Sequence, residues 1–122
     1  PDLPRAVVSS SSTEWIRGHL AHIGLDDAFG NHIYSGREHV ARGKPAPDLY
    51  LYAAKQLSVP VQECLVIEDS VPGATAGVAS GATTWGLLAG THIHADDEAR
   101  LRDIGVSNIV HSHAELRDAL GL

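Results

Sequence analysis

Apolar runs of strand length alternate with segments of helical periodicity along these 122 residues. The expected strands are Ala6–Val8, His32–Ser35, Cys64–Ile67, Thr83–Leu88 and Asn108–Val110. Four of the expected helices are Thr13–Ile23, Ser70–Gly81, Asp96–Ile104 and Ala114–Leu120. A further helix is expected where Leu49, Ala53 and Leu57 recur at every fourth residue. Strands that alternate with helices favour an α/β fold, because each helix returns the chain to a parallel strand. We therefore predict a Rossmann-like parallel sheet with helices on both faces.

Local signals refine two of these elements. The run Cys64–Ile67 has no polar residue in alternation, which predicts a strand covered on both faces. In the helix that follows, Ser70 is suited to cap the N-terminus and Pro72 fits the first turn. Gly81 is suited to a left-handed cap at the C-terminus.

The composition argues against several classes of partner. The formal net charge is −6 and only nine residues are Lys or Arg, which disfavours a nucleic-acid backbone or an anionic membrane surface. No apolar run approaches the roughly 20 residues of a membrane span. The single Cys64 cannot pair within the chain, which fits a reducing compartment, so we expect a cytoplasmic protein.

Glu68 and Asp69 come directly after the apolar run Cys64–Ile67. Ligands of open parallel sheets bind outside the carboxyl ends of the strands, so this is a position for chemistry. Adjacent carboxylates at the end of a buried strand repel each other and need a compensating positive charge, which predicts Mg²⁺ with oxygen ligands. Alternatively, Asp69 favours the N-terminus of the next helix and Glu68 is solvated.

Two further positions carry groups that suit a phosphate. Lys44 lies in the stiff segment GKPAP, where its ammonium group either points at a phosphate or is an ordinary surface charge. Ser9 and Ser10 begin a run of four serines after the first expected strand. Hydroxyl and N–H groups at such a turn hold an anion or cap a helix. Together, the serines, the lysine and the acid pair predict a site for phosphate and Mg²⁺ on one rim of the sheet.

The order VVSSSS, GKPAPDLYLYAA and CLVIEDSVPGATAGVASG resembles the haloacid dehalogenase superfamily, in particular its β-phosphoglucomutase-like phosphatase branch. The resemblance covers nearly the whole chain and implies the core fold of that superfamily. It implies that Ser9 holds the transferring phosphoryl oxygen with Ser10 beside it, and that Lys44 neutralises the phosphate and the nucleophile. It also implies that Glu68 and Asp69 help to bind Mg²⁺. Members of this branch hydrolyse small phosphate esters, often sugar phosphates, through an aspartyl-phosphate intermediate, so a small phosphorylated metabolite is the expected partner.

One departure from the family pattern is large. The Asp-x-Asp motif that supplies the nucleophile occurs nowhere in the 122 residues, and the helical cap domain is absent too. In the family, the nucleophile strand lies between the strands that correspond here to Ala6–Val8 and Cys64–Ile67. We therefore expect residues 1–122 to be the C-terminal portion of a core domain and to be inactive alone. Between those two strands we expect a gap, a direct contact, or a strand taken from elsewhere in the protein or from another chain.

The same residues are compatible with other functions. A family member that has lost its nucleophile could be a non-catalytic regulatory module that binds phosphate or Mg²⁺, and a phosphomutase would use the same groups. A receiver-like domain also has a parallel sheet, but it needs a lone aspartate at the end of a middle strand, and none is found. An upstream strand ending in Asp-x-Asp would favour the enzyme over the regulatory module.

Eight histidines include three closely spaced pairs: His19 and His22, His92 and His94, and His111 and His113. Because no cysteine cluster or acid at a matching spacing accompanies them, surface or structural roles are favoured over zinc binding. His92 and His94 follow the fourth expected strand and could border the site. Arg37, His39 and Arg42 lie in the lysine loop and could contact the substrate.

Overall fold

The structure is a computed structural model, and it describes residues 4–9, 12–22, 24, 29–88 and 96–121. Its strands are β1 (Val7–Ser9), β2 (Ile33–Ser35), β3 (Leu65–Glu68), β4 (Thr83–Leu87) and β5 (Asn108–Val110). Its helices are α1 (Thr13–His22), α2 (Asp48–Leu57), α3 (Val71–Ser80), α4 (Asp97–Ile104) and α5 (His113–Ala119), and a short 3-10 helix spans Val61–Glu63. Within the described ranges, no helix is long and apolar enough to cross a membrane.

Every expected strand and helix is present, and the caps predicted for α3 are confirmed. The Ser70 side chain accepts a hydrogen bond from the Gly73 N–H at 3.2 Å, so it caps the N-terminus of α3. Gly81 ends the same helix with a φ of 94°, in the left-handed region that glycine adopts without strain. β1 and β3 each end one residue later than predicted, so Ser9 and Glu68 belong to strands.

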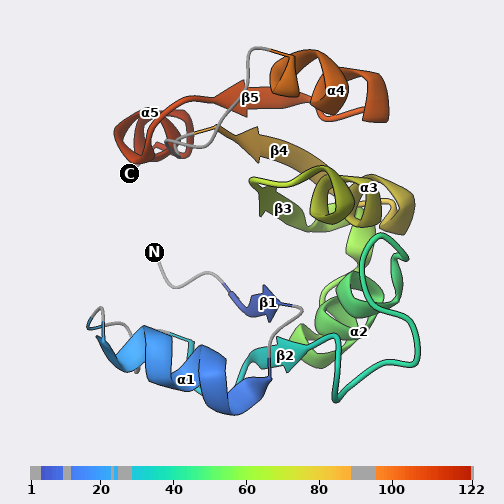
Figure 1. The fold of residues 1–122 in the computed structure, drawn as a ribbon, viewed down its shortest axis with the longest axis vertical. Coiled ribbons are helices and arrows are strands. Elements are labelled where there is room, and N and C mark those ends of the chain that lie inside the picture. The colour runs from blue at the N-terminus through green and yellow to red at the C-terminus, as the bar shows by residue number, and fades with distance from the viewer. Residues whose placement is uncertain (1–3, 10–11, 23, 25–28, 89–95, 122) are drawn as a thin grey trace.

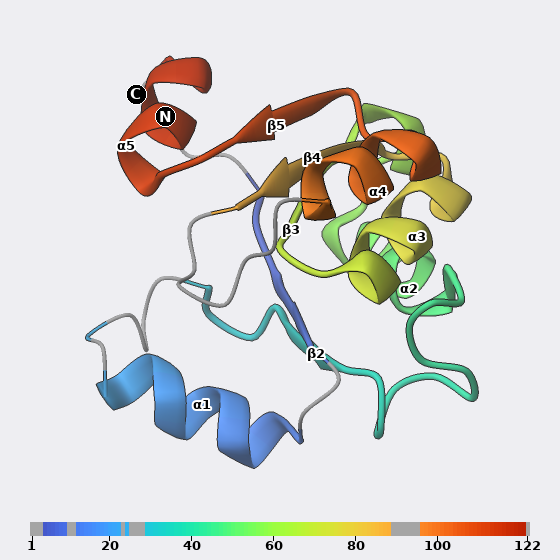
Figure 2. The same cartoon turned by 45° about the horizontal axis from the view of Figure 1, so that its top comes forward.

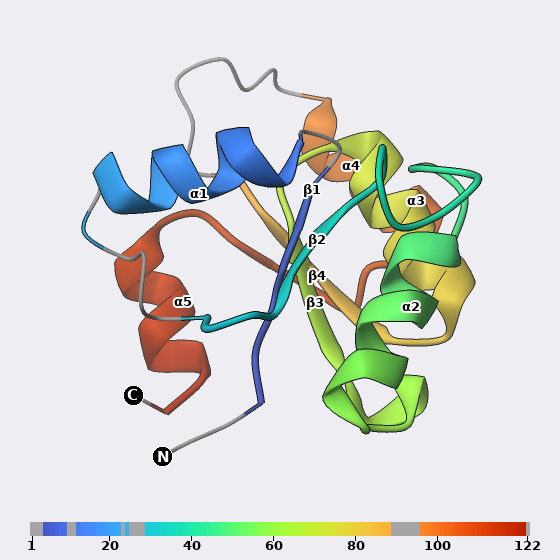
Figure 3. The same ribbon diagram turned by 90° about the horizontal axis from the view of Figure 1, so that it is seen from below.

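All strand pairs are parallel, as predicted, but they form two sheets (Figure 1). β1 pairs with β2, whereas β3, β4 and β5 form a second sheet in that order. α2 lies beside α3, so these two helices connect the sheets along one side of the molecule (Figures 2 and 3). The α/β class with parallel strands is therefore confirmed, and the strands of the described residues form two separate sheets.

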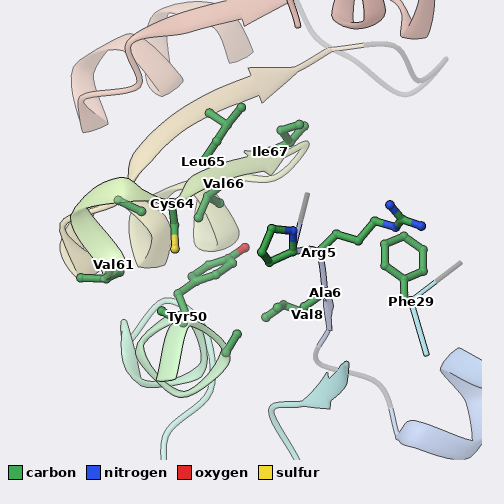
Figure 4. A pocket seen from close by; sticks show the side chains of 14 residues that line it. Arg5, Ala6, Val8, Phe29, Tyr50, Val61, Cys64, Leu65, Val66 and Ile67 are labelled. Carbon is green, nitrogen blue, oxygen red and sulfur yellow. The ribbon is translucent and has the colours of Figure 1, made fainter. Parts of the chain in front are cut away.

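A cavity of about 340 Å³ lies between β1 and β3 (Figure 4). Its lining is mostly apolar and comes from both sheets and from α2, including Ala6, Val8, Tyr50, Leu65 and Val66. The gap expected between these strands is thus present, and no strand formed by the described residues fills it. The structure does not close the gap by direct pairing of β1 with β3.

Helices α1 and α2 cover opposite faces of the β1–β2 sheet. Val7 packs with Ile16 and Leu20 of α1, whereas the next residue, Val8, packs with Leu49 of α2. Successive side chains of a strand point to opposite faces, so this small sheet is covered on both sides. The carboxyl end of β1 is thereby held between two helices.

The prediction that Cys64–Ile67 is covered on both faces is wrong. In β3, Val66 is buried against Ala76 of α3, but Leu65 and Ile67 are 39% and 37% exposed. Leu65, Val66 and Ile67 all belong to the lining of the cavity, and Figure 4 shows Leu65 and Ile67 on the other side of β3 from Val66. A continuous apolar run indicates that both faces can be buried, but burial also requires a packing partner on each face.

Candidate functional site

Lys44 bridges the two sheets at the carboxyl ends of β1 and β3. Its ammonium group donates to the Val8 carbonyl oxygen at 3.2 Å and to Glu68 Oε2 at 2.8 Å. The side chains of Lys44 and Glu68 are only 11% and 10% exposed, so the ion pair is largely buried. An ammonium group has three N–H donors, so these two contacts with described residues leave a third donor that could serve a ligand.

A second donor reaches the same carboxylate oxygen. Tyr50 of α2 donates its hydroxyl hydrogen to Glu68 Oε2 at 2.8 Å, and the Lys44 nitrogen lies 5.3 Å from the centre of the Tyr50 ring. Burial, followed by the negative charge of Glu68, raises the pKa of the Tyr50 hydroxyl well above its ordinary value. Tyr50 is therefore a stable donor at neutral pH, and both contacts to the carboxylate use Oε2.

Gly73 provides the space that the Glu68 carboxylate occupies. A Cβ atom at position 73 would lie 1.7 Å from Glu68 Oε2 and 2.2 Å from its Cδ. The carboxylate thus lies against the first turn of α3, the end of a helix at which negative charge is favourable. A residue larger than glycine at this position is incompatible with the ion pair.

Ser9 ends β1, directly after the carbonyl group that Lys44 contacts. The carbonyl oxygen of Ser9 accepts a hydrogen bond from the Gly36 N–H at 2.8 Å, which fixes the loop leading to Lys44 against the end of this strand. Asp69 follows β3 and is exposed. Ser10 lies outside the described residues. Lys44 and Glu68 are therefore in direct contact, whereas Ser9 and Asp69 are the neighbours in sequence of Val8 and Glu68.

Glu68 and Asp69 suit a hard divalent cation. Mg²⁺ is commonly bound by one or two carboxylates together with waters and phosphate oxygens, rather than by a complete cage of protein ligands. The described ranges contain no cluster of three or more His, Cys, Asp and Glu side chains able to hold a metal ion. The pair therefore fits Mg²⁺ as one part of a site that is completed by other oxygen ligands. The assignment of these two residues as ligands remains a prediction.

Other residues of the lysine loop have structural partners. Arg42 donates to both carboxylate oxygens of Asp48, at 3.2 and 2.9 Å. His39 accepts a hydrogen bond from the Ser35 N–H at its Nδ1 and stacks on Tyr52. Arg37 is exposed. Contact of Arg37, His39 or Arg42 with a substrate remains a prediction.

Two of the three histidine pairs lie within the described residues. His19, His22, His111 and His113 are exposed, and His111 Nε2 lies within hydrogen-bonding distance of Glu98 Oε1, at 2.9 Å. His92 and His94, which were predicted to border the site, lie outside the described residues.

Sequence reasoning missed Tyr50, the contact of Gly73 with Glu68, and Glu38. Tyr50 occurs next to Leu49 on the buried face of α2, where periodicity predicts a core aromatic residue and gives no sign of its polar partner. Glu38 contacts Thr13 at the start of α1, which lies 25 residues away in the sequence. No local pattern reveals either contact.

Residues 2–81 match the family of haloacid dehalogenase-like hydrolases. The chain belongs to this family. It is 44% identical over 80 residues to a bifunctional riboflavin kinase/FMN phosphatase of Arabidopsis thaliana, a match that covers 65% of this chain and 21% of that protein. It is 38% identical over 117 residues to a β-phosphoglucomutase of Mycobacterium bovis, covering 91% of this chain and 42% of that protein.

Solved structures of haloacid dehalogenase-like hydrolases share the fold. One from Deinococcus radiodurans, with bound phosphate and sodium, superposes with a TM-score of 0.86 and is 46% identical, covering 95% of this chain and 51% of that chain. The chain thus spans about half the length of this structure and less than half of the two curated relatives. The resemblance stated from the motifs is confirmed.

Proposed function

We propose that the full-length protein hydrolyses a small phosphate ester and that this chain supplies groups that bind the phosphoryl group. The observation that carries the proposal is the largely buried Lys44, which connects the end of β1 with Glu68 at the end of β3. A cation that is already fixed in place stabilises developing negative charge without reorganising first. The phosphate bound in the Deinococcus radiodurans hydrolase supports an anion as the ligand.

Each residue has a distinct role in this proposal. Ser9, with Ser10 beside it, holds the phosphoryl oxygens, and Lys44 offsets their charge through its remaining N–H donor. Glu68 and Asp69 would hold Mg²⁺, which supplies further positive charge to the phosphoryl group when it is bound. Tyr50 keeps Glu68 in place.

The proposed reaction also needs a nucleophile and a substrate. Because no Asp-x-Asp motif occurs in the 122 residues, the carboxylate that forms the proposed aspartyl-phosphate belongs to a part of the protein that this chain does not span. We propose a sugar phosphate as the substrate, on the basis of the similarity to a β-phosphoglucomutase.

The role of Lys44 is tested by Lys44→Ala in the full-length protein. A fixed cation acts mainly on the transition state, so we expect kcat for phosphate release to fall about a hundredfold or more. Lys55→Ala is the matched control, because Lys55 is an exposed lysine in the last turn of α2. A kcat within about threefold of the wild type for Lys44→Ala would show that the lysine has no catalytic role.

The metal site is tested by calorimetric titration of the full-length protein with Mg²⁺. Asp69→Asn removes one charged ligand, so we expect weaker binding than in the wild type. Asp118→Asn, an exposed aspartate on α5, is the control for loss of a negative charge. Equal affinity in the wild type and Asp69→Asn would rule out Asp69 as a ligand.

The similarity to a β-phosphoglucomutase also favours a second candidate, a phosphomutase. Phosphorus NMR of the full-length protein with sugar phosphates separates the two activities. A phosphatase releases inorganic phosphate, whereas a mutase moves the phosphoryl group between positions of the sugar. Phosphate binding without either reaction would favour the non-catalytic module.

A further inference from the structure

The Glu68 carboxylate uses its two oxygens unequally. Its Oε2 accepts hydrogen bonds from the Lys44 ammonium group and from the Tyr50 hydroxyl, each at 2.8 Å. An ionised carboxylate has about four lone-pair sites, two on each oxygen, so these two donors fill the sites of Oε2. Among the described residues, no donor contacts Oε1. The oxygen that remains for a ligand is therefore Oε1.

Oε1 is accessible, although the Glu68 side chain is only 10% exposed. Within the described part of the chain, no buried side-chain nitrogen or oxygen lacks a hydrogen-bond partner. Because Oε1 has no partner there, it reaches the solvent. The carboxylate thus offers one oxygen to a ligand at the carboxyl end of β3, next to the exposed Asp69.

The Tyr50 hydroxyl is not the only group that fixes this carboxylate. Lys44 pairs with it, and it lies against Gly73, where a Cβ atom would collide with both oxygens. The change Tyr50→Phe keeps the aromatic ring, whose centre lies 5.3 Å from the Lys44 nitrogen. Removing the hydroxyl therefore frees a lone pair of Oε2 and leaves the carboxylate in place.

Mg²⁺ and Ca²⁺ use carboxylates differently. Mg²⁺ is small and requires near-ideal octahedral geometry, whereas Ca²⁺ accepts a larger and more variable set of oxygens, including both oxygens of one carboxylate. We propose that Tyr50 acts through Glu68 as a positioning residue that determines cation specificity: together with Lys44, its hydroxyl leaves only Oε1 for a cation, which disfavours Ca²⁺ relative to Mg²⁺. The inference rests on the proposed function, because it assumes that Glu68 contacts the cation.

The test compares the dissociation constants of Mg²⁺ and Ca²⁺ for the full-length protein, each measured by calorimetric titration. For Tyr50→Phe we expect the ratio of the Ca²⁺ constant to the Mg²⁺ constant to fall roughly tenfold, because the freed lone pair lets Ca²⁺ bind both oxygens of Glu68. A general weakening of the site would raise both constants by the same factor and leave the ratio unchanged. The ratio therefore separates a specificity role from a merely structural one.

Tyr34→Phe is the matched control. Tyr34 is also a buried tyrosine, but its hydroxyl lies 2.6 Å from Nδ1 of His32 instead of beside Glu68. The variant removes a buried hydroxyl without changing the donors at Oε2, so the ratio should stay within about twofold of the wild type.

Infrared spectra of the wild type keep the inference testable even if Tyr50→Phe fails to fold. The splitting between the antisymmetric and symmetric carboxylate stretches is larger when one oxygen binds a cation than when both do. Difference spectra between the wild type and Glu68→Gln, each with and without Ca²⁺, isolate the bands of Glu68. We expect the larger splitting, which indicates binding through one oxygen.

Two outcomes would overturn this inference alone. One is an unchanged or higher ratio in Tyr50→Phe, and the other is the smaller infrared splitting in the wild type with Ca²⁺. An equal Mg²⁺ affinity in the wild type and Glu68→Gln would show that Glu68 is not a ligand, and it would refute the metal assignment of the proposed function and this inference with it. That comparison is made first, so the two kinds of failure are distinguishable.

Discussion

Replacing Gly73 by alanine should break the buried contacts of Glu68 without removing either charge. The new Cβ would lie 1.7 Å from Oε2 and 2.5 Å from Oε1. A carbon and an oxygen that are not bonded pack at roughly 3.4 Å, so the carboxylate would have to retreat by about 1.5 Å or more. The 2.8 Å contacts of Oε2 with Lys44 and Tyr50 would then exceed hydrogen-bonding distance.

The expected cost follows from those two contacts. Hydrogen bonds to charged groups contribute about 1.5–3 kcal/mol each, so their loss would cost about 3–6 kcal/mol. Alanine is more favourable than glycine in a helix by about 1 kcal/mol, which offsets part of this loss. We therefore expect Gly73→Ala to lower the free energy of unfolding by about 2–5 kcal/mol.

Urea denaturation of the 122-residue chain measures this change, provided that the m-value stays constant. Gly18→Ala is the matched control, because Gly18 lies inside α1 and a Cβ there meets nothing within 4 Å. That substitution should stabilise the chain by up to about 1 kcal/mol.

A double-mutant cycle identifies the cause of the loss. If the new methyl group acts by displacing the carboxylate, Gly73→Ala should be nearly neutral in a Glu68→Ala background, where the carboxylate is gone. The same cost in both backgrounds, or a cost below about 1 kcal/mol in the wild type, would refute this account of Gly73.

Three further predictions concern the ion pair, a buried tyrosine and the chain alone. Lys44→Met leaves Glu68 as an unpaired buried charge, so it should lower the free energy of unfolding, measured by urea denaturation, by about 3–5 kcal/mol. The double variant Lys44→Met with Glu68→Gln should recover most of this loss. An equal loss in the single and the double variant would contradict a buried ion pair. Burial, and next the charge of Tyr52, raises the pKa of Tyr34 above its ordinary value, so the unfolded chain loses this proton first. The contribution of the Tyr34 hydroxyl to the free energy of unfolding is therefore complete below about pH 10 and declines above it by at most about 1.4 kcal/mol per pH unit. Tyr34→Phe should flatten this part of the pH profile of stability. Finally, the 122-residue chain should release no phosphate from p-nitrophenyl phosphate with Mg²⁺, whereas the full-length protein should release it. If the 122-residue chain did turn over this substrate, and Asp69→Asn abolished the turnover, the nucleophile would lie within this chain, contrary to the proposal.

The sequence by itself determined the order of strands and helices and the location of the candidate site. Periodicity, the Ser70 cap and the Gly81 cap depend on residues close together in the chain, and the structure confirms both caps. The rule that ligands bind at the carboxyl ends of parallel strands directed attention to Ser9 and Glu68. Two of the three family motifs agree with that rule, because VVSSSS and CLVIEDSVPGATAGVASG contain the ends of β1 and β3.

Only the tertiary structure decided which groups meet. Lys44 joins β1 to β3 through Val8 and Glu68, and Tyr50 shares the same carboxylate oxygen, although local patterns show these residues as a loop lysine and a core aromatic. The apolar run of β3 predicted burial on both faces, but Leu65 and Ile67 on the second face are partly exposed. Hydrogen bonds and burial depend on segments that are far apart in the sequence, and no local periodicity encodes their relative placement.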